Sequence, residues 1–467
     1  MVLYGFALGN SNGNGDTHIL VKFIKRLFNK SKPDLPVIKA VTLPRSEHTI
    51  SREQISEYAL KVLYRLDKAG FRACLVGGAV RDLLLGREPK DFDVATDAHP
   101  EEVNQLFRNC RLIGRRFRLA HIHFGREIIE VATFRAGSGD DLSPQSEVQT
   151  TDTGRLLRDN QYGDIEQDAL RRDFTVNGLY YDIRDFSVHD YSRGIQDIEK
   201  GIIRLIGDPR QRFAEDPVRM LRAIRFMGKL GFRLSEDIET LVPEMAHKLS
   251  EIPAARLFDE VLKLFHSGYA VETFELLRHY GLFSYLFPLT EEALATEADG
   301  YPKTFILNAL INTDKRISQS LPVTPAFLYA VLLWEPLQVK MDDLLEAGDD
   351  SPSDYHRWQK AASFVIQQQV SQTSLPRRFS TITRDIWSLQ RRMQRINGKQ
   401  PERTFSHPAF RAAYDFLCLR ASIDDELLPL AEWWTEYQKD KPAAKDTVAP
   451  KRKRSRPRRR HKPSQHD

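Results

Sequence analysis

Two aspartates separated by one residue are the first groups in the sequence whose spacing suits a reaction. Asp91 and Asp93 lie in the segment KDFDVAT, which reads as a strand. Side chains two positions apart on a strand leave the same face. Two carboxylates so placed repel each other unless a cation lies between them, and they can hold two Mg²⁺ ions for phosphoryl transfer. Alone, the pair is a weak signal, since Asp-x-Asp also occurs in solvated turns.

A double glycine just upstream strengthens this interpretation. The segment LVGGAVRD predicts a strand that ends at Gly77 and Gly78 and a helix that begins there. Glycines let phosphates approach the backbone, and amides at a helix N-terminus point toward an anion. Arg81, one turn into the helix, can add a charged donor. The alternative is a tight turn in which Arg81 and Asp82 pair on the surface.

A third acidic residue, Glu130, falls in the apolar strand segment EIIEVATF. If this carboxylate faces inward it needs a partner, and we favour a metal ion over an exposed edge position. His189 and Asp190 form a His–Asp pair of the kind found in metal phosphohydrolases, but other His ligands are missing and hydrolase activity is not expected. His121 and His123 alternate on a neighbouring strand, and we interpret them as packing residues.

The elements that would position these residues form a small α/β unit beginning near Ser51. It contains an amphipathic helix in ISEYALKVLYRLDKAG and strands in FRACLV, KDFDVAT, AHIHFG and EIIEVATF. After about residue 210 helical periodicity takes over, from DPVRMLRAIRFMGKLG to AAYDFLCLRA. The pattern indicates an α/β head followed by a long helical body.

Length and composition agree with this outline. A chain of 467 residues predicts two or three domains, and a hydrophobic content of 41% with 10% aromatics is typical of a soluble globular protein. No stretch approaches the roughly 18 apolar residues needed to span a bilayer. The three cysteines include no CxxC, which argues against a disulfide framework or a structural zinc site. We therefore expect a cytoplasmic protein.

Positive charge is concentrated at the C-terminal end. Residues 451–467 hold nine Lys or Arg and one Asp, a charge of +8, so the remainder carries 5 − 8 = −3. Such a segment cannot bury a core, and it is predicted to be disordered and to bind polyanions by counterion release. The alternative is a tail that only aids solubility. Near the N-terminus, HILVKFIKRLFNK predicts a basic amphipathic helix that either packs on the protein or contacts a membrane surface.

Four segments in a fixed order carry a family resemblance. LVGGAVRDLLLG, DFDVAT, RRDFTVNGLYYD and EDPVRMLRAIRF resemble the bacterial class II nucleotidyltransferases, which comprise poly(A) polymerases and CCA-adding enzymes. The match covers roughly residues 50–275. The entry segment LPRSEHTISREQISEYALKVLYRLDKAGF and the later HPAFRAAYDFLCLRA are similar to the poly(A) polymerase branch and extend the likeness over about residues 43–435.

The resemblance implies an α+β fold. We expect a small palm-type nucleotidyltransferase head with a mixed β-sheet, then a long all-helical neck and body, and a disordered basic tail. Five regions follow from it: a variable N-terminal segment at 1–45, the catalytic head at 46–185, a neck for base recognition and RNA binding at 186–275, an RNA-binding helical body at 276–437, and the tail at 438–467.

The resemblance also implies roles for the segment RRDFTVN. Arg172 would meet the triphosphate, Asp173 would lie near the ribose and the reacting centre, and Asn177 would support the pocket. Asp91 and Asp93 would bind the metals. From the residues alone, Arg172 and Asp173 could equally form a surface ion pair. Whether Asp173 acts as a base or as a ribose ligand stays open.

The segment EDPVR has two interpretations that can hold together. Asp216 before Pro217 is typical of a helix N-cap followed by proline at the first helical position. The resemblance adds that Asp216 and Arg219, on one helix face, present an acceptor and a donor to the edge of adenine. Arg222 and Arg225 extend the basic face, either toward phosphates or as the solvated side of a helix.

A second basic cluster lies in the expected body. Trp387 and Phe379 are interleaved with it, and charge beside aromatic rings can hold a single strand without sequence readout. An amphipathic helix with an exposed arginine face is the alternative. The cluster comprises Arg377, Arg378, Arg384, Arg391, Arg392 and Arg395.

The predicted activity is that of a poly(A) polymerase in RNA 3′-end polyadenylation and turnover. It would transfer AMP from ATP to an RNA 3′-hydroxyl with release of pyrophosphate, with Mg²⁺ as cofactor. The partners would be RNA 3′ ends and ATP, with RNA-turnover proteins in addition, and the protein would act as a monomer. The alternative enzyme is a CCA-adding tRNA nucleotidyltransferase. An inactive RNA-binding regulator is disfavoured because both carboxylates and the glycine turn are present.

Overall fold

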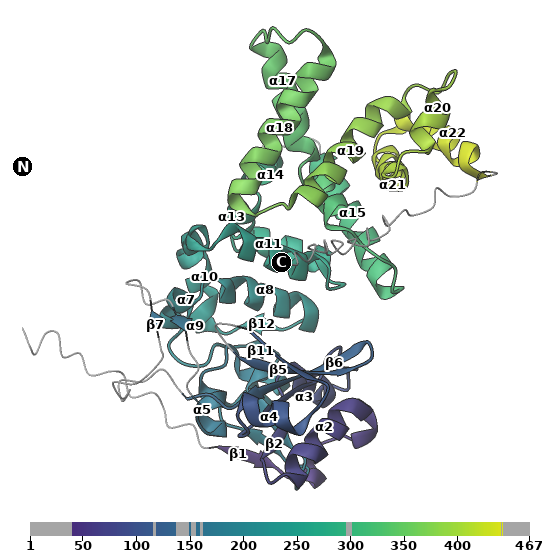
Figure 1. Ribbon diagram of the computed structural model, residues 1–467. Coiled ribbons are helices and arrows are strands. Elements are labelled where there is room, and N and C mark those ends of the chain that lie inside the picture. Colours follow the sequence, from purple (N-terminus) through teal and green to yellow (C-terminus); the bar gives the residue numbers. More distant parts are fainter. Residues whose placement is uncertain are drawn as a thin grey trace, which may run out of the picture.

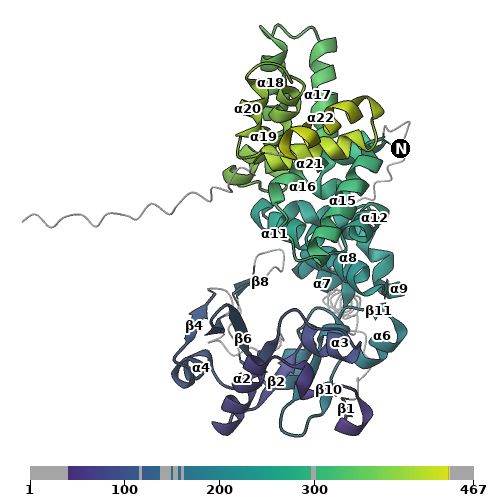
Figure 2. The ribbon, with the colours of Figure 1, turned by 90° about the vertical axis from the view of Figure 1, so that its right-hand side faces the viewer.

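The computed structural model describes residues 40–114, 118–136, 149–150, 156–158, 162–295, 301–439 and 441. A β-sheet lies at one end of the molecule and a stack of helices extends from it to the other end (Figures 1 and 2). The predicted N-terminal basic helix and the basic tail lie outside the described residues.

Eight strands form one mixed sheet in the order β1-β10-β9-β2-β3-β6-β5-β4. Strands β3 and β6 are parallel, and the other neighbours are antiparallel. The mixed sheet that we expected for the head is therefore confirmed. Its strands are β1 Val41–Leu43, β2 Ala73–Val76, β3 Asp93–Thr96, β4 Cys110–Ile113, β5 Leu119–Phe124, β6 Glu127–Thr133, β9 Leu179–Asp182 and β10 Val188–Asp190.

Helix α2 (Glu57–Lys68) supplies much of the head core. Ser56 caps it by accepting a hydrogen bond from the Tyr58 amide, and Gly70 follows its end with a φ of +91°. Its buried face, with Val62 and Leu66, packs in the same core as Leu75 of β2. The spacing of these apolar residues is that of an amphipathic helix on a sheet.

Several shorter elements complete the head and its junction with the neck. Strands β11 and β12 form a parallel pair, and β7 and β8 an antiparallel one. The bounds are α3 Gly78–Leu84, α4 Pro100–Leu106, β7 Gln149–Thr150, β8 Leu156–Arg158, α5 Ile165–Leu170, the 3₁₀ turn η3 Thr175–Asn177, α6 Gly194–Lys200, β11 Ile202–Ile203 and β12 Arg233–Leu234. Strand β10 pairs with β9, so the head sheet continues past the boundary that we predict after residue 185.

Between residues 209 and 439, the secondary structure of the described residues is helical apart from β12. The helices are α7 Pro209–Glu215, α8 Val218–Leu230, α9 Glu236–Glu239, α10 Leu241–Met245, α11 Ala254–Phe265, α12 Ala270–His279, α13 Phe283–Leu286, α14 Pro288–Ala295, α15 Tyr301–Ser318, α16 Pro325–Leu332, α17 Trp334–Glu346, α18 Asp354–Gln372, α19 Arg377–Met393, α20 Gln400–Phe405, α21 Phe410–Ala421 and α22 Leu428–Lys439. The predicted helical neck and body are confirmed.

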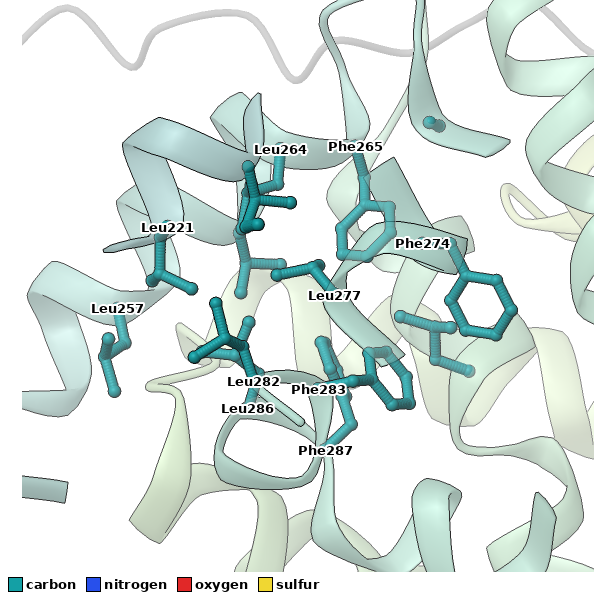
Figure 3. Close-up of a cluster of buried hydrophobic side chains, with 14 of the residues drawn as sticks. Leu221, Leu257, Leu264, Phe265, Phe274, Leu277, Leu282, Phe283, Leu286 and Phe287 are labelled. Atoms are coloured by element: carbon teal, nitrogen blue, oxygen red, sulfur yellow. The ribbon is translucent and has the colours of Figure 1, made fainter. Parts of the chain in front are cut away.

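One continuous core joins the neck to the body. Leu221 of α8, Leu257 of α11 and Phe274 of α12 belong to it, and Phe283 and Phe287 stack against each other at 5.3 Å between ring centroids (Figure 3). Burial of such side chains contributes roughly 1.5–3 kcal/mol each. The apolar face of α8 packs in this core. Within the described residues, the helices are all too short or too polar to cross a membrane.

Candidate functional site

The three predicted metal ligands line one cleft of about 950 Å³ where strand β3 begins. Strand β3 begins at Asp93, so Asp91 precedes the strand instead of lying within it, as the sequence suggested. Parallel pairing with β6 sets Asp93 directly beside Glu130. Asp91, Asp93 and Glu130 thus line the same cleft, although their carboxylate oxygens do not all lie within 4.8 Å of one another, and Glu130 takes a solvent-exposed position on its strand.

Electrostatics at Asp93 reflect the crowding of carboxylates. Desolvation and the negative charges of Glu130 and Asp91 raise the pKa of Asp93, Arg172 opposes them, and the net result is a pKa of about 6. The Asp93 side chain still has solvent access. A carboxyl surrounded by like charges favours its protonated form until a cation arrives.

His121 also lines the cleft, although the sequence suggested only a packing role. It lies opposite Glu130 on the antiparallel strand β5, with its Nε2 3.1 Å from Oε1 of Glu130. A cross-strand register is needed to see this pair, and the spacing of residues along one strand does not reveal it.

The glycine turn faces the RRDFTVN segment. Gly77 has a φ of +70°, and a Cβ there would lie 3.4 Å from Nη1 of Arg172. A side chain at this position would therefore be strained and would crowd the guanidinium. Helix α3 begins at Gly78, as predicted.

Two residues that sequence reasoning missed hold Arg172 in place. Asp168 accepts a hydrogen bond from Arg172 Nη2 at 3.0 Å, and Tyr180 accepts one from Nε at 2.8 Å. Tyr180 in turn donates to the same Asp168 oxygen at 2.6 Å. Desolvation alone would lower the pKa of Arg172, but Tyr180 and Asp168 raise it above its ordinary value. The four-residue spacing of Asp168 and Arg172, which allows an ion pair along a helix, was the sequence signal that could have identified this contact.

Arg81 lies inside the protein, only 2% exposed. It pairs with Asp82, as in the alternative interpretation, but the pair is buried. Arg81 Nη1 also donates to Asn177 Oδ1 at 2.6 Å, and Lys229 of α8 donates to the second Asp82 oxygen at 2.9 Å. The direct phosphate contact suggested for Arg81 stays a prediction, and the structure gives Arg81 a role in supporting Asn177.

Asp173 is held at the head–neck junction. Arg222 of α8 donates to its Oδ2 from Nε at 2.7 Å, and its Oδ1 accepts from Asn177 at 3.3 Å. Desolvation would raise the pKa of Asp173, but the Arg222 charge and these hydrogen bonds lower it to about 2. Asp173 is therefore ionised at neutral pH. This supports a role as an acceptor or ligand more than as a base.

Asp216 and Arg219 both have protein partners. Helix α8 begins at Val218 with Pro217 as its N-cap, one residue later than predicted, while Asp216 Oδ1 accepts a hydrogen bond from the Val218 amide at 3.3 Å. Its Oδ2 accepts from Arg256 at 2.6 Å. Arg219 donates to Glu215 at 2.9 Å. The base contacts expected of Asp216 and Arg219 stay predictions.

A second group of candidate ligands lies elsewhere in the head. Within the described ranges, Asp182, Asp185 and His189 are the residues whose donor atoms all fall within 4.8 Å of one another. Arg72 already donates to Asp182 at 3.1 Å, so this group has a cation of its own. Asp190 instead accepts from backbone amides, including that of Ser192 at 2.9 Å. The His–Asp pair is therefore divided between two structural roles.

Trp387 in α19 is fully buried, and its indole N–H donates to the Ala330 carbonyl at 2.9 Å. It cannot serve as a base-stacking platform. Phe379 packs partly against the body core. Helix α19 is amphipathic, with Arg377 and Arg378 exposed at its start, and RNA binding by these arginines stays a prediction.

Comparisons with known proteins agree with this geometry. The chain matches the families described as "Poly A polymerase head domain" over residues 73–204, "Probable RNA and SrmB- binding site of polymerase A" over 231–294 and "Polymerase A arginine-rich C-terminus" over 351–466. The first match contains the three carboxylates of the cleft and the glycine turn, and the third contains α19.

Full-length relatives extend the match. Poly(A) polymerase I of Salmonella typhi is 49% identical over 428 residues, which is 90% of this chain and 92% of the relative. The CCA-adding enzyme of Lactobacillus helveticus is 36% identical over 47% of this chain and 52% of its own length. The solved Bacillus stearothermophilus CCA-adding enzyme in complex with CTP superimposes with a TM-score of 0.53 at 25% identity and covers 81% of each chain. The chain belongs to the bacterial poly(A) polymerase I family of nucleotidyltransferases.

Proposed function

We propose that the chain is a polynucleotide adenylyltransferase that joins AMP from ATP to the 3′-hydroxyl of RNA and releases pyrophosphate. The observation that carries the proposal is the pairing of Asp93 with Glu130 across parallel strands, in a cleft that Asp91 also lines. Arg172 lies close enough to lower the Asp93 pKa and to approach the Gly77 turn. Carboxylates for a metal and an arginine for a phosphate thus converge.

The cleft suits a divalent cation by the chemistry of its donors. Asp91, Asp93 and Glu130 offer carboxylate oxygens, which are the ligands that Mg²⁺ prefers. The raised pKa of Asp93 supports a local excess of negative charge that a cation would relieve. Bound Mg²⁺ would supply charge neutralisation at the triphosphate and a lowered pKa for the attacking hydroxyl.

The surrounding residues act by positioning. Arg172, fixed by Asp168 and Tyr180, would hold triphosphate oxygens next to the glycine turn. Asp173, ionised and held by Arg222, would accept a hydrogen bond from a ribose hydroxyl. Fixed groups of this kind catalyse by orientation and charge stabilisation, with little chemistry of their own.

The extent of the match favours poly(A) synthesis over CCA addition. The Salmonella relative aligns with 90% of the chain, whereas the CCA-adding relative aligns with 47%. The longer alignment supports the polymerase assignment. Binding of RNA 3′ ends and ATP, a cytoplasmic location, action as a monomer and contact with RNA-turnover proteins are parts of this proposal.

The test is the length and composition of the product. A short RNA incubated with Mg²⁺ and either ATP or CTP should give a long ladder with ATP and almost no extension with CTP. Incorporation of CTP followed by termination would instead identify the CCA-adding activity. No extension with either nucleotide would leave only an RNA-binding protein.

The metal role of Asp93 is tested in the same assay. Asp93→Ala should abolish extension while RNA affinity stays within about twofold, because the carboxylate acts on the reacting groups and not on the RNA strand. Glu199→Ala, which removes an exposed acid on α6, is the matched control and should keep full activity. Extension by the Asp93 variant under Mg²⁺ would refute the assignment.

A further inference from the structure

Strands β6, β5 and β4 form the outer part of the head sheet, on the side where β4 and β6 are labelled in Figure 2. Their side chains alternate between two environments. Those on one face, such as Leu112, Ile122 and Val131, pack in the head core with α2. On the other face, Ile113 is 40% exposed and Ile128 is 42% exposed. This second face, here called the open face, consists of Arg111, Ile113, Leu119, His121, His123, Ile128 and Glu130.

The strand register places one row of the open face in line with the proposed reacting centre. Val76, which precedes the glycine turn, pairs with Asp93, and Asp93 pairs with Glu130. Glu130 pairs in turn with His121, and His121 pairs with Arg111. Residues directly opposite each other on neighbouring strands project from the same face of a sheet. The row therefore runs from the glycine turn, across the carboxylates, to Arg111 on the edge strand β4.

The order of this row separates the two sides of the proposed reaction. In phosphoryl transfer, the attacking and leaving oxygens lie roughly in line on opposite sides of the phosphorus. Arg172 and the Gly77 turn, where the proposed function has the triphosphate bind, lie on the β2 side of Asp93. The attacking 3′-hydroxyl must then reach Asp93 from the β6 side, which is where the open face begins.

The open face carries the kinds of group that bind a single-stranded nucleic acid. The rings of His121 and His123 lie 6.4 Å apart between centroids, and histidine rings stack on unpaired bases. Ile128, directly opposite His123, adds exposed apolar surface. Arg111 is exposed and, among the described residues, makes neither a hydrogen bond nor an ion pair, so its charge is available to a phosphate.

The size of the open face also favours a short strand. From β3 to β4 the row crosses three strand spacings, roughly 14 Å. At about 3.4 Å for each stacked base, this length accommodates about four nucleotides. A stable interface with another protein needs about 20–30 residues on each side, which is far more than the open face offers.

We propose that the open face binds the last few nucleotides of the RNA 3′ end. The terminal ribose lies beside Asp93 and Glu130, the preceding bases lie against the two histidine rings, and Arg111 contacts the RNA backbone at the edge of the sheet. This inference rests on the proposed function and adds to it an RNA contact on the head, separate from the neck and body. The histidines and Arg111 hold the strand by stacking and charge and take no part in bond making.

Photo-crosslinking of the full-length protein in the absence of ATP tests where the 3′ end lies. Two oligo(A) strands are compared, one with a single 4-thiouridine at its 3′ terminus and one with the same label in the middle of a long strand. After irradiation, the crosslinked peptides are identified by mass spectrometry. The terminal label should crosslink to peptides from residues 111–130, and the central label should not. A terminal label that crosslinks only to the neck or body overturns the proposal.

Two variants test the contacts by titration with oligo(A) in the absence of ATP. His123→Ala should weaken binding about fivefold or more, because a base loses its stacking partner, and His123→Phe, which keeps a ring, should restore it. Arg111→Gln should lower the slope of log affinity against log salt by about 0.7, because one fewer counterion is released. Affinity for Mg-ATP, measured without RNA, should stay unchanged in both. Lys68→Gln, an exposed cation on α2 across the sheet, is the control.

Unchanged oligo(A) affinity in both His123→Ala and Arg111→Gln overturns the proposal. If either variant also has a lower melting temperature, the crosslink on the unaltered protein decides. Failure of the proposed function would be seen separately, as the absence of an ATP ladder from the parent protein. The crosslink and the titrations need no turnover, so they would still show whether the open face binds an RNA 3′ end.

Discussion

At the residue scale, most charged groups of the site are arranged by other charged groups. Asp173 contacts Asn177 and Arg222, and Asn177 contacts Arg81. Arg172 is fixed by Asp168 and Tyr180. Such a network is stable only when each member keeps its partner, since an unpaired charge in a protein interior is costly. Substitutions here should therefore change both stability and substrate binding.

Asp168 provides the sharpest test of this dependence. Asp168→Asn keeps the shape but removes the charge facing Arg172, so the KM for ATP should rise about tenfold and the free energy of unfolding should fall by about 2–3 kcal/mol. Tyr180→Phe removes only a hydroxyl and should cost about 1 kcal/mol. Steady-state kinetics and urea unfolding measure the two effects. A large stability loss with an unchanged KM would make Asp168 purely structural.

At the scale of elements, local sequence patterns predicted the individual helices, strands and turns. The contacts between elements, which depend on strand register and packing, could not be predicted from these patterns. The strands β5 and β6, the glycine turn before α3 and the helix α8 follow from residue spacing. The alignment of Asp93 with Glu130 follows from a parallel register that joins segments distant in sequence. The burial of Arg81 and Trp387 follows from packing between elements, which periodicity does not encode.

In helix α19, burial gives Trp387 a structural role instead of the base-stacking role that the sequence suggested. Trp387→Phe loses the hydrogen bond to Ala330 and part of the buried ring, so the free energy of unfolding should fall by about 1–3 kcal/mol with RNA affinity unchanged. The double variant Arg377→Ala and Arg378→Ala removes exposed charge. It should weaken RNA binding and leave the free energy of unfolding unchanged. Unfolding curves and RNA titrations at two salt concentrations read out both. If the folded Trp387→Phe variant bound RNA more weakly, the prediction would be wrong and Trp387 would contribute to RNA binding.

At the scale of the whole molecule, the core shared by neck and body should make the helical part respond to pH as one unit. His266, after α11, has its pKa lowered to about 4 by desolvation. The unfolded chain binds a proton near pH 6.5, whereas the folded chain does so only near 4. Stability should therefore be unaffected by this residue above pH 6.5 and should fall as pH drops from 6.5 to 4.

His266→Gln should remove this part of the acid destabilisation. The difference in melting temperature between variant and parent, measured across pH 8 to 4, should shift in favour of the variant only below about pH 6.5. His279→Gln, which changes an exposed histidine on α12, is the control and should follow the parent. Parallel curves for His266→Gln and the parent would show that His266 does not contribute.

The junction at Asp82 constrains how such proteins can be recombined. One oxygen of this carboxylate faces Arg81 within the head, and the other faces Lys229 on α8, while Arg87 donates to the Lys229 carbonyl at 2.9 Å. A chimera that takes its head from one relative and its neck from another would take the Asp82 and Arg87 positions from one parent and the Lys229 position from the other. Grafting the two modules would succeed where donor and acceptor are transplanted together, and crossovers between them should be tolerated poorly in evolution and in design.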